Sequence, residues 1–70
     1  MKKSEYLVRI GLNIDSLRKK KDYTISYLGD IAGIGKNNLI PVIKGHRNIT
    51  ISTLAKIALA LEVDPKELLK

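Results

Sequence analysis

A chain of 70 residues, 44% of them apolar, suffices for one domain with a small core, so residues 1–70 are predicted to form a single domain. The lack of cysteine excludes disulfides and thiolate metal sites, and the short apolar runs without a signal-peptide core exclude a membrane span and secretion, so we expect a cytoplasmic protein without a membrane partner. A net charge of +6 excludes little, because it serves solubility as well as an anionic partner.

Helical periodicity describes the first half of the chain. A first helix is predicted to end near residues 19–21, three lysines that a helix C-terminus favours. Its buried stripe consists of Leu7, Ile10, Ile14 and Leu17. Thr24 is predicted to cap a second helix, and Gly33 suits the left-handed residue that ends it. The residues of this helix expected to face the core are Leu28, Ile31 and Ala32.

A third helical segment is predicted from Lys36 to Lys44, where Gly45 stops it. Its inward residues are expected to be Leu39, Val42 and Ile43. Pro41 lies in the middle of this segment, where it removes an amide donor and crowds the carbonyl of Asn37. We therefore expect Pro41 to kink or shorten the third helix.

The last third of the chain predicts two more helices. Thr50 caps the fourth, whose core stripe is Ile51, Leu54, Ile57, Ala58 and Leu61. Asp64 and Pro65 are typical of a helix start and open the fifth. Strand-like alternation is absent, so the sequence predicts an all-α fold of five helices.

Two short helices hinged at Gly33 predict a helix-turn-helix over about residues 24–44. Gly29 lies four residues before the hinge. Helices that cross at a steep angle need a very small residue at their contact, and we expect Gly29 to be that residue.

Residues 10–69 resemble the lambda-repressor/Cro-like (Xre-type) helix-turn-helix family of bacterial and phage transcriptional regulators. The resemblance rests on the spacing of Ile10-Gly11, Ile14, Leu17-Arg18, Thr24, Leu28, Ala32-Gly33-Ile34, Leu39, Gly45, Arg47-Asn48, residues 52–58, Leu61 and Val63. It implies a compact five-helix lambda-repressor-like domain. It also implies a nucleoid-associated homodimer that binds double-stranded operator DNA with the third helix in the major groove, most simply as a repressor.

The resemblance also implies site residues. Base-reading positions correspond to Lys36, Asn37, Asn38, Ile40 and Pro41. Phosphate-binding positions correspond to Thr24, Ile25, Lys44, His46, Arg47 and Asn48. A dimer seam would use Val63, Leu68 and Leu69, although closure of the monomer core explains these residues equally well. A polar helix start is the alternative explanation of Lys36 and Asn37.

Three positions depart from the family pattern, namely Pro41, Ile25 and Ile43. Ile25 stands where the family usually has glutamine, which leaves only its backbone amide for a phosphate. Ile43 replaces a glutamate that in the family packs against the arginine corresponding to Arg18. We therefore expect Arg18 to turn to Asp15, Asp22, a carbonyl, solvent or a DNA phosphate, and Ile43 to pack in the core.

Other function classes are weighed against a DNA-binding regulator. A protein-interaction module, such as an antitoxin or relic repressor, would use the apolar surface at Ile40 and Pro41 for a protein partner. The charge favours DNA, because residues 1–49 hold ten Lys or Arg against four acids. An enzyme fits poorly, since a single His and scattered acids provide no nucleophile–base pair, and we expect no cofactor or metal.

Overall fold

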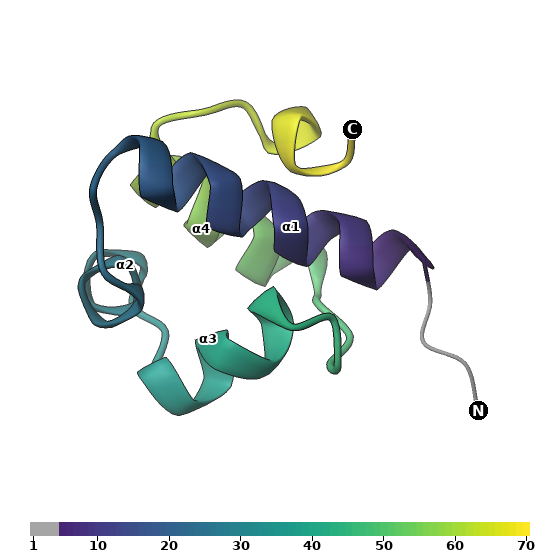
Figure 1. The fold of residues 1–70 in the computed structure, drawn as a ribbon, viewed down its shortest axis with the longest axis horizontal. Helices are drawn as coiled ribbons and strands as arrows, with labels where there is room; N and C mark the ends of the chain where they lie inside the picture. Colours follow the sequence, from purple (N-terminus) through teal and green to yellow (C-terminus); the bar gives the residue numbers. More distant parts are fainter. Residues whose placement is uncertain (1–4) are drawn as a thin grey trace.

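The computed structural model describes residues 5–70, so the first four residues of the predicted domain lie outside it. Its elements are α1 (Glu5–Lys20), α2 (Ile25–Ala32), α3 (Lys36–Ile43), α4 (Ile51–Leu61) and the 3-10 helix η1 (Pro65–Leu68). Figure 1 shows α1 crossing the molecule, with α2 and α3 on one side of it, η1 on the other and α4 behind. No strand occurs in residues 5–70, which confirms the all-α prediction for this part of the chain.

Every element contributes at least one fully buried side chain to a common core. These side chains, each less than 2% exposed, are Ile14, Leu28, Leu39, Ile57, Leu61 and Leu68. Burial of each such residue stabilises the fold by about 1.5–3 kcal/mol relative to exposure. The short helices α2 and α3, of eight residues each, would not persist alone in water, so this shared core holds them in place.

Two of the predicted core residues are exposed instead. Ile31 is 43% exposed because the buried face of α2 is formed by Leu28, Gly29 and Ala32, and Ile31 lies to one side of it. Ile51 is 79% exposed because it begins α4 at the edge of that helix's buried stripe. In both helices the predicted stripe was too wide.

The predicted fifth helix is wrong, since the chain forms four α-helices and only a four-residue 3-10 helix at Pro65–Leu68. The Asp64 side chain caps this turn by accepting from the amide of Lys66 at 3.0 Å. The side-chain amide of Asn13 on α1 then donates to the carbonyls of Leu68 and Lys70, both at 3.0 Å. These two hydrogen bonds hold the backbone that follows the turn against α1.

The end of α3 packs closely on α1 at Gly11. A Cβ built on Gly11 would lie 2.8 Å from the carbonyl carbon of Ile43 and 2.9 Å from the carbonyl oxygen of Val42. Real Cβ atoms do not approach carbonyl groups so closely, so α3 reaches this position only because residue 11 has no side chain. Ile43 itself is partly buried and packs against the core, as expected.

Candidate nucleic-acid interface

The helix-turn-helix is formed by α2, a turn at residues 33–35 and α3. Thr24 caps α2, with its hydroxyl oxygen accepting from the amide of Tyr27 at 2.9 Å. Gly33 ends α2 in the left-handed region at φ 72°, which glycine adopts without strain. The sequence predicted both of these residues in their observed roles.

Gly29 sets how closely the turn packs on α2. A Cβ built on Gly29 would lie 2.5 Å from the carbonyl oxygen of Ile34, so a larger side chain would push the turn away. The amide of Ile34 donates to the carbonyl of Gly29 at 2.8 Å and fixes the same contact from the backbone. The predicted need for a very small residue here is confirmed.

The first turn of α3 presents a polar surface. Lys36, Asn37 and Asn38 are exposed, while Ile40 and Pro41 are half-buried. The buried side of the same helix consists of Leu39 and Val42. The predicted base-reading residues therefore divide into an accessible polar group at the start of α3 and an apolar pair with less free surface.

Pro41 does not end α3. The helix begins at Lys36 and continues through Pro41 to Ile43, so the proline is the sixth helical residue and lies beyond the first turn. After the helix the backbone turns back toward its last turn, where the amide of His46 donates to the carbonyl of Pro41 at 2.9 Å. An interior proline removes one amide donor, yet α3 ends within one residue of the predicted Lys44, so the expected shortening of the helix does not occur.

The predicted phosphate-binding residues lie in two places. Thr24 and Ile25 are at the start of α2, where Thr24 is exposed and Ile25 half-buried. The others follow α3 and are all exposed: Lys44, His46, Arg47 and Asn48. Of this second group, Arg47 and Asn48 line the same hollow as Asn38.

This hollow, of about 320 Å³, lies between α3, the turn before it and the start of α4. The fully buried Leu39 and Ile57 contribute to its lining, as do Thr50 and Thr53. Two of its lining residues are hydrogen-bonded to each other, since Arg47 Nη1 donates to Asn38 Oδ1 at 2.9 Å. Residues nine positions apart in the sequence are thus brought together at the start of the predicted recognition helix.

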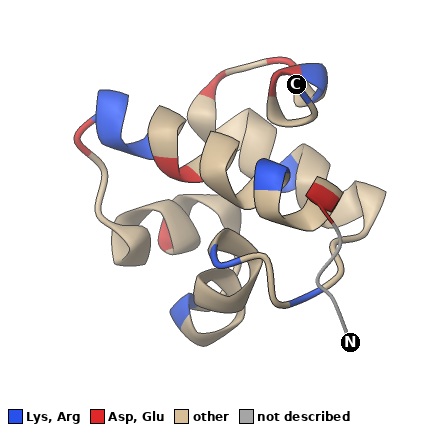
Figure 2. Cartoon of the chain, turned by 45° about the vertical axis from the view of Figure 1, so that its right-hand side comes forward, with Lys and Arg blue, Asp and Glu red and all other residues tan. Residues whose placement is uncertain are grey.

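Charge separates this region from the rest of the chain. No Asp or Glu occurs in residues 31–61, whereas Lys36, Lys44, Arg47 and Lys56 do. Figure 2 shows blue without red along α3 and the loop after it. Four ion pairs occur within residues 5–70, and none of them includes Lys36, Lys44 or Arg47. The positive charge of these three residues is therefore not neutralised by an ion pair within residues 5–70.

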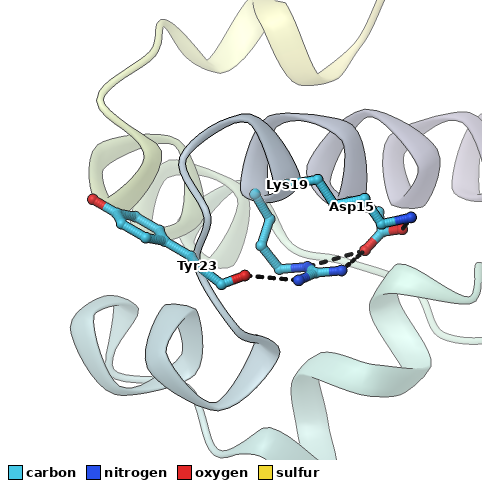
Figure 3. Close-up of polar contacts among 4 residues, drawn as sticks. Asp15, Lys19 and Tyr23 are labelled. Atoms are coloured by element: carbon cyan, nitrogen blue, oxygen red, sulfur yellow. Dashed lines mark hydrogen bonds and ion pairs between the residues drawn. The ribbon is translucent and has the colours of Figure 1, made fainter.

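Three cations at and just after the end of α1 are instead engaged within the fold, namely Arg18, Lys19 and Lys21. Arg18 Nε donates to Asp15 Oδ1 at 3.0 Å, and Arg18 Nη1 donates to the carbonyl of Tyr23 at 2.7 Å (Figure 3). Lys19 adds an ion pair to Asp15 at 3.2 Å, and Lys21 pairs with Glu62 at 3.0 Å. Asp15 and a carbonyl were both among the expected partners of Arg18, which is turned toward the end of α1 and the loop before α2.

This arrangement predicts a small pH dependence of stability. The hydrogen bond from Arg18, with a further one from Lys19, lowers the pKa of Asp15 below its ordinary value. A carboxylate whose pKa is lower in the folded state stabilises the fold above its unfolded pKa, and that stabilisation is lost as the pH falls below about 4. Because Asp15 is 26% exposed, we expect a loss of about 1 kcal/mol or less.

The measurement is urea unfolding at neutral and acidic pH for the wild type, Asp15→Asn and Asp30→Asn. Asp15→Asn is expected to destabilise the domain at pH 7 and to flatten the acid dependence. Asp30 is exposed and takes part in none of the four ion pairs, so Asp30→Asn serves as the matched control. An equal change in both variants would contradict the assigned role of Asp15.

The three residues of the predicted dimer seam differ in how far they are buried. Leu68 is fully buried within the chain and closes the core, the alternative kept open above. Val63 is partly buried against that core, and Leu69 is 52% exposed. The most exposed large apolar residues of the described chain are Leu59 and Ile51, both on α4, at 80% and 79%. Sequence reasoning missed these two because helical spacing alone does not reveal which neighbours cover a helix.

Within residues 5–70, no three His, Asp or Glu side chains are grouped as a metal site would require. In the same residues, none of the helices has both the length and the apolar character needed to cross a bilayer.

Comparison with known proteins identifies a matching family and several similar structures. The family model HTH_3, described as helix-turn-helix, matches residues 14–68. The restriction-modification controller protein C.AhdI from Aeromonas hydrophila is 31% identical, with a TM-score of 0.86 over 89% of this chain and 94% of that one. SinR, the master regulator for biofilm formation, crystallised in complex with DNA, is 34% identical, with a TM-score of 0.83 over 87% and 98% of the two chains.

A hypothetical transcription factor from Neisseria, NHTF, shares the fold with a TM-score of 0.91 at 23% identity, covering 100% of this chain and 80% of that one. No match is found among curated protein sequences. Because the family model covers most of the chain, this protein belongs to the HTH_3 helix-turn-helix family, the Xre or lambda-repressor-like class.

Proposed function

We propose that this protein is a sequence-specific double-stranded DNA-binding transcriptional regulator, most simply a repressor, that places α3 in the major groove. The observation that carries the proposal is the exposed polar start of α3 beside a stretch, residues 31–61, that has cations and no acid. SinR, which is similar over nearly its whole length, was crystallised in complex with DNA, and this supports the same ligand class here. The protein would act in the cytoplasm, on the nucleoid.

Within this proposal, Lys36 and Asn37 contact base edges. Lysine donates to guanine, and asparagine pairs two-way with adenine in the major groove. Lys44, His46, Arg47 and Asn48, together with Thr24 and the amide of Ile25, contact phosphates. Ile40 and Pro41 are half-buried and would at most touch thymine methyl groups at the edge of the contact.

Selection of bound sites from random duplex DNA, followed by fluorescence anisotropy at several salt concentrations, tests the proposal. A DNA-binding regulator enriches one site and loses affinity steeply as salt rises, because bound phosphates release counterions. A homodimer would enrich inverted repeats about one helical turn apart. A protein-interaction module without DNA binding would enrich no site, and that result would refute the proposal.

Substitutions separate the two kinds of contact. Lys36→Ala and Asn37→Ala are each expected to lose about 1–3 kcal/mol of discrimination at one base pair. Arg47→Ala is expected to weaken binding to the selected site and to random DNA alike, and to reduce the salt slope by about 0.9 for one phosphate. The readout is the ratio of the two affinities for each variant. Equal losses on both DNAs for Lys36→Ala and Asn37→Ala would show that these residues do not read bases.

A further inference from the structure

Asn38 differs from its neighbours at the start of α3 in what its side chain contacts. Its Oδ1 accepts from Arg47 Nη1 at 2.9 Å. Arginine can only donate, so the contact with Arg47 fixes which end of the amide is the oxygen. The oxygen end of the Asn38 amide thus contacts a group of the protein itself.

The same contact suits a phosphate-binding arginine. A carboxylate partner would hold the guanidinium but would also cancel its charge, as Asp15 does for Arg18. Asn38 is neutral, so Arg47 keeps its full charge and the rest of its N–H donors. The hydrogen bond also ties the loop after α3 to the first turn of α3, so less side-chain freedom remains to be lost when Arg47 binds an anion.

We infer that Asn38 is a positioning residue that holds Arg47 for a DNA phosphate, and that it does not read a base. This inference rests on the proposed function and changes one of its assignments, since Asn38 was predicted to read bases. Base reading at the start of α3 is then left to Lys36 and Asn37. Asn38 instead affects affinity for all DNA sequences through Arg47.

The test uses the full chain as wild type, Asn38→Ala, Arg47→Ala and the double variant, each measured on the site selected by the wild type and on a random duplex of the same length. Asn38→Ala is expected to weaken both complexes by the same factor, about threefold to tenfold. In the Arg47→Ala background it should change affinity by less than about twofold, because the residue it positions is gone. Repeated site selection with Asn38→Ala should return the wild-type site.

Two further variants sharpen the result. Asn37→Ala is the matched control, since it removes the same side chain from the adjacent exposed position, and it should alter the selected site. Asn38→Asp keeps the acceptor but places a carboxylate on the guanidinium, so the salt slope should fall by about 0.9, as for Arg47→Ala. Asn38 and Arg47 are both exposed, and circular dichroism melts verify that the variants remain folded.

Two results would overturn the inference while leaving the proposed function intact. One is a change of preference at a single base pair in Asn38→Ala, which would make Asn38 a base reader. The other concerns affinity for random DNA. It is a loss in the double variant that equals the product of the losses in Asn38→Ala and Arg47→Ala measured separately. If the wild type binds no duplex at all, the proposed function fails first, and the inference fails with it.

Discussion

Replacement of Gly11 by alanine is expected to destabilise the domain by about 3 kcal/mol, near the upper end of the usual cost of overpacking. The added methyl group would overlap the carbonyl of Ile43, and the nearby carbonyl oxygen of Val42 lies only 2.9 Å away. Backbone groups cannot turn aside as a flexible side chain can, so α1 and α3 must separate. For a domain of this size the loss corresponds to a fall in Tm of roughly 12–24 °C.

Thermal unfolding followed by circular dichroism measures this change. Ser16→Ala is the control, because Ser16 is an exposed residue of the same helix and alanine there should be neutral or slightly stabilising. In an isolated helix Gly11→Ala would also stabilise, by about 1 kcal/mol. The direction of the change in Tm therefore distinguishes a close helix contact from an isolated helix. A higher Tm for Gly11→Ala would contradict the close contact between α1 and α3.

Leu68→Ala is expected to destabilise the domain by about 2–5 kcal/mol, the range found when a buried leucine is truncated. Leu68 is fully buried, although it lies in a four-residue turn near the end of the described chain. Asn13 holds that turn on α1 through the carbonyl of Leu68, so the cavity left by the substitution cannot close without breaking this contact.

The adjacent residue supplies the comparison. Leu69 is 52% exposed, and Leu69→Ala should change the free energy of unfolding by less than about 0.5 kcal/mol. Urea unfolding of the two variants measures both values under the same conditions. Similar small effects for both would mean that η1 is not part of the core and that Leu68 is available for a dimer seam after all.

Local rules were sufficient for most of the helix-turn-helix. The cap at Thr24 and the left-handed Gly33 depend on contacts within a few residues, and both are present as predicted. Leu28 and Leu39 are buried at the positions that helical spacing predicted. The all-α class follows for the same reason, since helical spacing is read along one segment at a time. The need for a very small residue at Gly29 was also predicted, although from the crossing of two helices, whereas the observed close contact is with the carbonyl oxygen of Ile34 in the turn.

The tertiary structure decided everything that depends on which distant segment lies opposite. Gly11 resembles any helix glycine until the end of α3 is placed on it, and Ile31 and Ile51 fit a buried stripe until the neighbours leave them uncovered. The last turn is a 3-10 helix whose final carbonyl, that of Leu68, accepts from Asn13, more than fifty residues earlier. Asn38 became a partner of Arg47 in the same way. Sequence periodicity shows on which side of its own helix a side chain lies. Which other segment covers that side is decided by the packing between helices.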